Sequence, residues 1–124
     1  MLNLNSIMIG SKQPKELADF YSQVLGKQPD MVDDGWYGFN AGGCFLTIGE
    51  HSEVDEAALE PQRIILNFET DDVQGEFDRL KELGATVVAE PYAFEEGEDV
   101  AVATMADIDG NFFQLMAPWE EEAE

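Results

Sequence analysis

Hydrophobic positions recur at three- and four-residue spacing in two segments of the chain, residues 14–25 and 73–83. This spacing places the apolar side chains on one stripe of an amphipathic helix. Gly26 and Gly84 follow the two segments directly, where a helix commonly ends in a left-handed residue. Asp71 and the glutamine three positions later have the spacing of a capping box before the second segment. The pattern therefore predicts two helices of similar design.

Short segments rich in β-branched and aromatic residues surround these helices and are bounded by Gly, Pro or Asp, which is typical of strands. Residues 30–32 form a weaker strand candidate, and the turn residues at 40–43 and 107–111 predict tight hairpins. The polar segment 52–62 separates the elements into two groups. The predicted strands comprise residues 6–10, 36–41, 44–49, 63–69, 86–90, 100–106 and 112–118.

The same order of elements occurs twice along the chain. Each half contains a strand, a helix that ends in Leu-Gly and then three strands, and Gly26 and Gly84 lie 58 residues apart. One βαβββ module cannot bury both faces of a curved sheet by itself, whereas two modules can, within one chain or across a dimer. The predicted fold class is α+β, with two βαβββ modules whose curved mixed sheets enclose a cavity.

This repeat predicts one domain at residues 1–119, followed by an acidic tail at 120–124. Module one is expected at about residues 1–51, the linker at 52–62 and module two at 63–119. A length of 124 residues and a hydrophobic content of 44% suit a globular domain of this size.

Composition also indicates where the protein acts. No stretch reaches the roughly 18 apolar residues of a membrane helix, and the N-terminus has no basic region of the kind that begins a signal peptide. The single cysteine, Cys44, cannot form an internal disulfide, which suits a reducing compartment. We therefore expect a cytoplasmic protein.

The balance of charge is the unusual feature, with 27 acidic residues, 6 basic residues and a net charge of −21. Such a surface repels nucleic-acid phosphates and anionic lipids, so we expect neither nucleic acid nor membrane as a partner. Two explanations stay open: an acidic coat adapted to a high-salt cytoplasm, and a negative cleft that attracts a cationic ligand. The acids are scattered along the whole chain, which favours the coat.

Three motifs resemble those of the vicinal-oxygen-chelate superfamily. Residues 17–26 are similar to its helix with an aromatic pair and a terminal Leu-Gly, and residues 107–115 to its final Asp-Gly-Asn hairpin. Residues 70–73, before the second helix, match a third motif of the superfamily. The resemblance extends from Ser6 to about Trp119 and implies the glyoxalase/bleomycin-resistance fold, whose members include metalloenzymes and metal-free proteins that sequester bleomycin-like antibiotics.

The enzymes of this superfamily hold a divalent metal with His, Glu or Gln from the first and last strands of each module. Such an ion needs several nitrogen or oxygen donors at about 2.0–2.2 Å. By resemblance, the four ligand positions fall on Ser6, Thr47, Ile65 (or Arg63, one strand step away) and Gln114. Only Gln114 is a suitable ligand, and a neutral amide alone does not retain a divalent ion. We therefore expect no metal, no other cofactor and no glyoxalase-type activity.

A cavity lined by apolar and neutral polar side chains is the remaining candidate site. Trp36 and Tyr37 are adjacent, so strand alternation sends one ring toward the core and the other toward the cavity. Methionines provide an adaptable lining, and Trp119 is predicted to close one end. The predicted cavity residues are Ser6, Met8, Trp36, Tyr37, Thr47, Ile65, Asn67, Met105, Phe112, Gln114 and Met116.

The leading hypothesis is a metal-free protein that binds a small molecule. A homodimer is expected because two-fold assembly covers the exposed faces of curved sheets. One alternative is a lyase- or dioxygenase-like enzyme with an atypical site that involves Glu50, His51, Glu69 or Gln114. His51 is the only histidine, which excludes a site with several histidines. Another alternative is sequestration of a cationic antibiotic, which is consistent with the resemblance and with the net charge.

Overall fold

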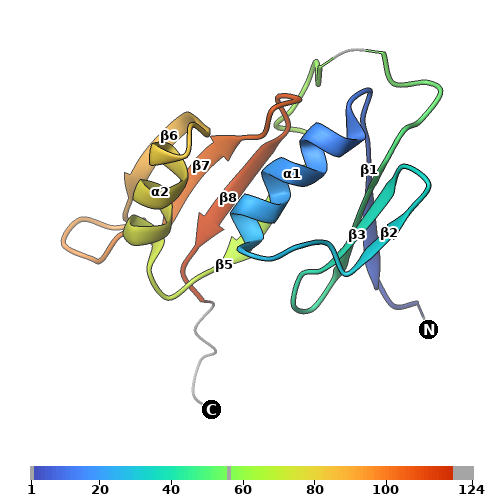
Figure 1. Cartoon of the computed structure of the whole chain (residues 1–124). Helices are drawn as coiled ribbons and strands as arrows, with labels where there is room; N and C mark the ends of the chain where they lie inside the picture. Colours follow the sequence, from blue (N-terminus) through green and yellow to red (C-terminus); the bar gives the residue numbers. More distant parts are fainter. Residues whose placement is uncertain (1, 56, 119–124) are drawn as a thin grey trace. The chain divides into compact units, whose positions relative to one another are not determined.

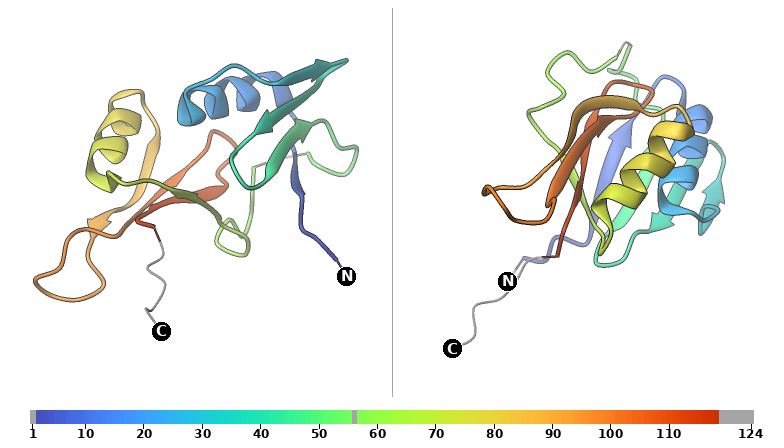
Figure 2. Two further views of the ribbon diagram at one scale, coloured as in Figure 1. Left: turned by 90° about the horizontal axis from the view of Figure 1, so that it is seen from below. Right: turned by 90° about the vertical axis from the view of Figure 1, so that its left-hand side faces the viewer.

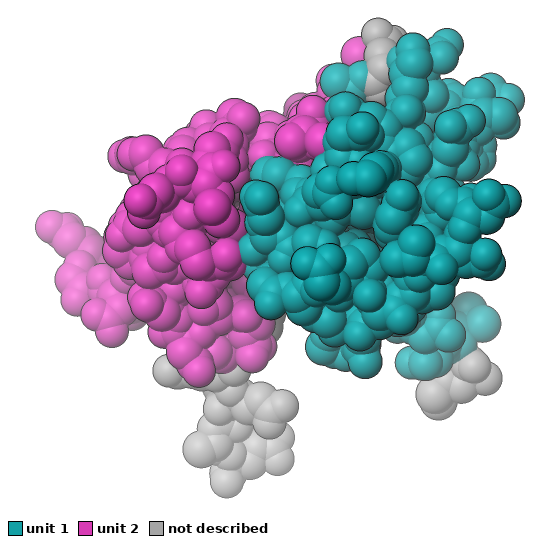
Figure 3. All heavy atoms as spheres, in the orientation of Figure 1, with its two compact units in different colours: residues 1–57 teal, residues 58–124 magenta. Residues whose placement is uncertain are grey.

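The computed structural model describes residues 2–55 and 57–118, which form two compact units. Unit 1 comprises residues 1–57 and unit 2 residues 58–124 (Figure 3). Each unit contains one four-stranded mixed sheet and one helix in the order β-α-β-β-β (Figure 1). The predicted α+β class with two βαβββ modules is therefore confirmed. The predictions for Trp119 and the acidic tail lie outside the described residues.

The sheet of unit 1 has the strand order β1-β4-β3-β2. Its first strand runs parallel to its last, and the other neighbours are antiparallel. The parallel pair places the first strand of the module at the edge of the sheet, beside its last strand. The elements of unit 1 are β1 (Ser6–Gly10), α1 (Pro14–Leu25), β2 (Met31–Asp33), β3 (Trp36–Asn40) and β4 (Phe45–Gly49).

Helix α1 begins and ends as its sequence predicts. A proline occupies its first turn, and Gly26 ends it at a φ of 70°, with its backbone N–H donating to the carbonyl oxygen of Ser22 at 2.8 Å. The helix packs against β3 and β4. Its buried residues share one face and are Leu17, Ala18, Tyr21 and Val24.

The turn between β2 and β3 was not predicted. Asp34 and Gly35 connect the strands as a two-residue loop with φ values of 47° and 84°. Positive φ at both positions is the conformation that matches strand twist in two-residue hairpins, and Asp-Gly is a preferred pair for it. This turn makes the weakly predicted second strand a regular partner of β3.

Unit 2 repeats the arrangement with the strand order β5-β8-β7-β6, again with its first and last strands parallel. The pairing of β6 with β7 is irregular in two places, between Val87 and Ala89 and between Ala89 and Tyr92. Irregular pairing of this kind bends a strand locally. The elements of unit 2 are β5 (Leu66–Glu69), α2 (Val73–Glu82), β6 (Thr86–Tyr92), β7 (Val102–Ala106) and β8 (Phe112–Met116).

Helix α2 packs across β6, β7 and β8 (Figure 2), and its buried residues are Val73, Phe77 and Leu80. Its N-terminal cap is Asp72, whose carboxylate accepts a hydrogen bond from the backbone N–H of Gly75 at 2.9 Å. The helix begins at Val73, as predicted, but its cap is Asp72 and not Asp71, so the capping prediction was wrong by one residue.

Strand β5 is shorter than predicted, because residues 63–65 precede it in irregular structure. The backbone N–H of Arg63 donates to the carbonyl oxygen of Glu60 at 3.1 Å, and Ile64 is 75% exposed. The β-branched residues Ile64 and Ile65 are typical of strands, so the sequence predicts a longer strand than the structure contains. The strand predicted at residues 100–106 likewise begins later, at Val102, and β6 extends two residues further than predicted.

The hairpin between β7 and β8 is confirmed at residues 107–111. The backbone N–H of Asp107 donates to the carbonyl oxygen of Asn111 at 2.8 Å. The Asp107 carboxylate is buried and accepts from the backbone N–H groups of Asp109 and Asn111, each at 2.9 Å. The Asp107 carboxylate therefore has a structural role in this turn. In the part of the chain that the structure describes, no helix has the length and apolar character needed to span a membrane.

Candidate functional site

Each sheet has one face against its helix and a second face, which we call the far face. In unit 1, strand register places Ser6, Met8, Trp36 and Thr47 together on the far face. Met8 is 46% exposed and Trp36 is 37% exposed. Four of the predicted cavity residues therefore lie on one surface of one sheet.

Two glycines let aromatic rings lie close to the backbone on this far face. A β-carbon at position 49 would overlap the indole of Trp36, and one at position 38 would lie 2.7 Å from the ring of Phe45. The far face of unit 1 therefore carries two aromatic rings against the sheet, beside the thioether of Met8 and the hydroxyls of Ser6 and Thr47. Thr47 also donates a long hydrogen bond, 3.5 Å, to the carbonyl oxygen of Ile7.

His51 lies at one end of this far face. A β-carbon at position 10 would lie 3.0 Å from the His51 Cβ, so the histidine packs over the end of β1. Its Nδ1 accepts a hydrogen bond from the backbone N–H of Glu53 at 3.1 Å. That bond fixes the ring by a local turn, while the side chain stays exposed. Glu50 is exposed beside it.

The far face of unit 2 brings together three of the predicted residues, Gln114, Phe112 and Met116, and a fourth, Asn67, on the neighbouring strand. The side-chain amide of Gln114 donates to the hydroxyl of Thr104 at 3.1 Å. Thr104 is 7% exposed. The one predicted residue that was suited to ligate a metal thus already has a partner within its own sheet.

Three predicted cavity residues do not lie on a far face. Met105 is fully buried and pairs with Phe113 on the helix-packed face. Tyr37 pairs with Ile48 on the helix-packed face of unit 1, which leaves Trp36 as the ring that points the other way. Ile65 precedes β5 and is half-buried. Met105 is a core residue and Tyr37 is half-buried on the helix-packed face, because strand register, and not residue type, decides which face a side chain joins.

The donor set at the four positions that the resemblance assigns to metal ligands does not suit a divalent ion. Ser6 and Thr47 offer hydroxyl groups, Ile65 offers no donor, and the amide of Gln114 is bonded to Thr104. Residues 2–55 and 57–118 contain no group of three or more His, Cys, Asp or Glu side chains placed to hold a metal. Neutral hydroxyls and one amide do not replace the imidazole and carboxylate ligands that such ions require.

Two ion pairs perturb the pKa of a side chain, and both lie outside the far faces. A hydrogen bond from Lys27, with a second from the backbone N–H of Asn40, lowers the pKa of Asp30 below its ordinary value of 3.8. The hydrogen bond to Asp19 raises the pKa of Lys15 above 10.5. Both pairs are at the surface of unit 1, where they support local structure.

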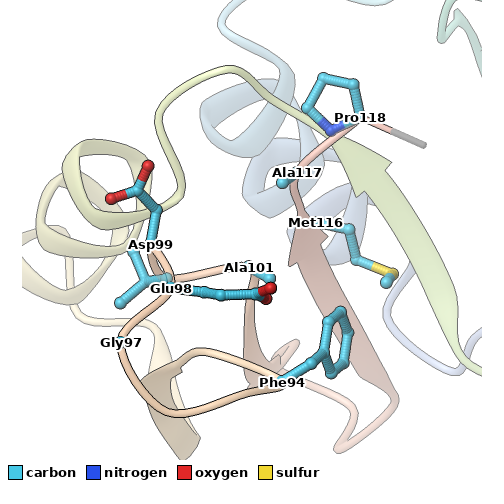
Figure 4. Close-up of a pocket in the computed structure, with 9 residues that line it drawn as sticks. Phe94, Gly97, Glu98, Asp99, Ala101, Met116, Ala117 and Pro118 are labelled. Carbon is cyan, nitrogen blue, oxygen red and sulfur yellow. The ribbon is translucent and has the colours of Figure 1, made fainter. Parts of the chain in front are cut away.

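The structure also contains a pocket that the sequence did not predict. It lies in unit 2, between the loop that connects β6 to β7 and the end of β8 (Figure 4). Its lining comprises Phe94, residues 97–101 and residues 116–118. Met116 is the one predicted cavity residue among them. No periodic pattern marks this loop in the sequence, so only the folded chain shows the pocket.

Solved structures with the same fold extend over nearly the whole chain. A glyoxalase-related enzyme from Fulvimarina pelagi is 15% identical, with a TM-score of 0.75, and the match covers 95% of this chain and 89% of the other. A glyoxalase/bleomycin resistance protein/dioxygenase family enzyme from Burkholderia phytofirmans PsJN is 20% identical, with a TM-score of 0.74 and coverage of 94% and 98%. TnmS3, an antibiotic binding protein from Streptomyces sp. CB03234, is 21% identical, with a TM-score of 0.72 and coverage of 96% and 98%.

No curated protein sequence matches the chain. The family described as the glyoxalase-like domain matches residues 6–116, from the first residue of β1 to the last of β8. The match includes both βαβββ modules. The chain therefore belongs to the glyoxalase-like domain family, within the vicinal-oxygen-chelate superfamily.

Proposed function

We propose that this protein binds a small, largely apolar or aromatic molecule on the far face of unit 1, without a metal ion. The observation that carries the proposal is the chemistry of the far face of unit 1. Trp36 and Phe45 lie against the sheet there, next to Met8 and two hydroxyl groups. Binding sites for small molecules combine apolar and aromatic surface with a few neutral polar groups in this way.

The absence of suitable metal ligands supports the metal-free part of the proposal. Hydroxyl, aliphatic and amide side chains occupy the positions where enzymes of the superfamily hold their ion. Without such an ion, the polarisation of a substrate oxygen that it supplies in those enzymes has no counterpart among these residues. Binding without assigned catalysis is therefore the function that we propose first.

Sequestration of a cationic antibiotic is the second candidate. One specific observation favours it: the chain shares its fold over 96% of its length with an antibiotic binding protein at 21% identity. The net charge of −21 adds a long-range attraction for cations. This candidate differs from the first only in the ligand, so one experiment addresses both.

The test is a thermal-shift screen of small molecules that includes bleomycin and other cationic antibiotics. A ligand at a hundredfold excess over its Kd stabilises the folded state by about 2.7 kcal/mol, which shifts the melting temperature measurably. The Trp36→Ala variant is expected to lose the shift. Val32→Ala, which removes an exposed apolar side chain from the opposite face of the same sheet, is the control and should retain it.

Elemental analysis and a chelator test the metal-free part separately. We expect no stoichiometric divalent metal in the purified protein and an unchanged melting temperature after treatment with EDTA. About one equivalent of Zn, Ni, Mn or Fe per chain would overturn this part. Stabilisation by a ligand that Trp36→Ala and Val32→Ala retain equally would instead place the ligand elsewhere.

We further propose that the protein is a homodimer in solution. Each sheet has its second face free of a helix from its own unit, and two-fold assembly is the commonest way to cover such surfaces. Light scattering coupled to size-exclusion chromatography at micromolar concentration measures the mass directly. A monomer mass under these conditions contradicts the proposal.

A further inference from the structure

The pocket of unit 2 has a cavity volume of about 670 Å³ and a wall that backbone hydrogen bonds hold in place. The backbone N–H of Ala101 donates to the carbonyl oxygen of Tyr92 at 2.9 Å, which closes the base of the β6–β7 loop. The backbone N–H of Ala117 donates to the carbonyl oxygen of Ala101 at 2.8 Å and ties the end of β8 to the same point. At the tip, the backbone N–H of Glu98 donates to the carbonyl oxygen of Glu95 at 3.2 Å.

The walls combine apolar groups with one centrally directed carboxylate. Phe94 and Met116 line one side of the pocket, and the Glu98 side chain extends from the loop with its carboxylate toward them (Figure 4). The Asp99 carboxylate points away from Phe94 and Met116 (Figure 4). An aromatic ring, a thioether and a carboxylate therefore converge on one space.

No positive charge of the surrounding chain neutralises this carboxylate. Residues 82–118 contain no Lys, Arg or His, and they include the whole lining of the pocket. Among the described residues, the ion pairs involve Asp19, Asp30, Glu60 and Glu76, and not Glu98. The negative net charge of the chain adds to the local field and increases the concentration of cations near the pocket.

We propose that this pocket binds a small organic monocation with an aromatic or apolar body, such as a substituted ammonium ion. The Glu98 carboxylate pairs with the positive charge, the Phe94 ring attracts the cation with its negative face, and Met116 packs against the apolar part. Most of the lining is exposed to solvent, including Phe94 and Glu98, so we expect a dissociation constant on the order of 1 mM. The site does not depend on the ligand proposed for the far face of unit 1.

The experiment titrates the full chain with benzyltrimethylammonium in low-salt buffer and follows backbone and methionine methyl resonances by NMR. Shift changes are expected at residues 94–101 and at the Met116 methyl group. Two further probes separate the parts of the ligand: tetramethylammonium has the charge without the ring, and benzyl alcohol has the ring without the charge. Each is expected to bind at least about fivefold more weakly than benzyltrimethylammonium, since each loses one of the two interactions.

Matched variants test the residues. Glu98→Gln and Phe94→Ala are each expected to weaken binding about fivefold. Glu95→Gln removes the same charge from the same loop at a position outside the lining, so its dissociation constant should stay within about twofold of the parent. Trp36→Ala on unit 1 should leave binding unchanged. The spectrum of each variant without ligand shows whether the fold is retained.

Several results would overturn the proposal. Equal weakening by Glu98→Gln and Glu95→Gln would mean that only the general negative field attracts the probe. Equal affinity for benzyl alcohol would mean that the carboxylate has no part in binding. Shift changes confined to unit 1, together with a loss of binding in Trp36→Ala, would place the cation on the far face of unit 1 and thus support the proposed function against this second site.

Discussion

At the scale of single residues, Asp30 joins the segment after α1 to the end of β3. Its carboxylate lies 2.7 Å from Lys27 Nζ and accepts the backbone N–H of Asn40, also at 2.7 Å. These two interactions hold the pKa of Asp30 below its ordinary value. The stabilisation that they supply is therefore present above the pKa of the unfolded chain and is lost as the pH falls through the folded pKa.

The Asp30→Asn variant is expected to show a smaller loss of melting temperature than the parent as the pH falls below about 4, because it lacks the carboxylate that protonation releases. Melting curves from about pH 7 to about pH 2 measure this difference. Asp33→Asn, a neighbouring exposed acid that does not bond to Lys27 or Asn40, is the control. Parallel curves for the parent and Asp30→Asn would contradict the assignment.

Gly49 makes the close approach of Trp36 to the sheet possible. In Gly49→Ala the new methyl group would overlap the indole, so the ring or the strand has to move. We expect a loss of about 1–3 kcal/mol in the free energy of unfolding. Gly43→Ala is the control, because a β-carbon there meets nothing within 4 Å.

Denaturant unfolding of the two variants measures the difference. If the overlap with the indole is the cause, Gly49→Ala should cost less stability in a Trp36→Ala background than it does in the parent. Equal stability of Gly49→Ala and Gly43→Ala would mean that the ring moves aside without cost.

The candidate site could be predicted from the sequence only in part, and register explains the difference. Strand alternation correctly grouped Ser6 with Met8, since they lie two positions apart on one strand. Met105 was grouped with the wrong face, because its pairing with Phe113 depends on the length of the β7–β8 turn and not on its own type. The resemblance to the superfamily supplied the fold but not the face of each residue.

At the scale of elements, periodicity predicted both helices closely and misplaced the start of β5. Apolar residues on a helical period extend over ten residues or more, so a single error does not move the helix. The strand prediction depended on two isoleucines at positions 64 and 65, which lie outside the strand in the folded chain. The N-terminal cap of α2, by contrast, could not be assigned from the sequence, because Asp71 and Asp72 are adjacent and both can cap a helix.

The cap of α2 gives a direct test at this scale. Asp72→Ala removes the carboxylate that accepts the backbone N–H of Gly75 and is expected to cost about 1 kcal/mol of stability. Asp71→Ala removes the adjacent acid, which does not cap the helix, and should cost less than half as much. Denaturant unfolding measures both variants, and equal losses would show that charge near the helix N-terminus, and not the capping hydrogen bond, is responsible.

At the scale of the whole molecule, the excess of acids dominates the electrostatics. Even if every one of the 6 basic residues paired with an acid, 21 of the 27 acids would remain uncompensated. The ion pairs of the described residues are each at least 37% exposed and therefore contribute little. Repulsion between carboxylates opposes the compact state, and its sum is comparable to the ~5–15 kcal/mol net stability of a domain.

Salt should therefore stabilise the protein. At about 1 M the screening length falls to ~3 Å, and most of the repulsion between surface carboxylates disappears. We expect the melting temperature to rise by several degrees from dilute buffer to about 2 M KCl. A series that is flat or falls with salt would remove the main support for an acidic coat and favour a localised negative site for a cation.

The parallel pairing within each sheet has a consequence for the order in which the chain assembles. β1 is an edge strand whose neighbour is β4, and β5 is an edge strand whose neighbour is β8. The hairpins β3–β4 and β7–β8 close over a few residues, whereas each parallel pair joins two strands that most of a module separates in the sequence. Because long-range pairing forms slowly, the amides of the first strand in each module should be the last to gain protection from hydrogen exchange. Pulse-labelled hydrogen exchange during refolding is expected to find the amides of both hairpins protected before those of β1 and β5, so that each module folds from its C-terminal end toward its beginning.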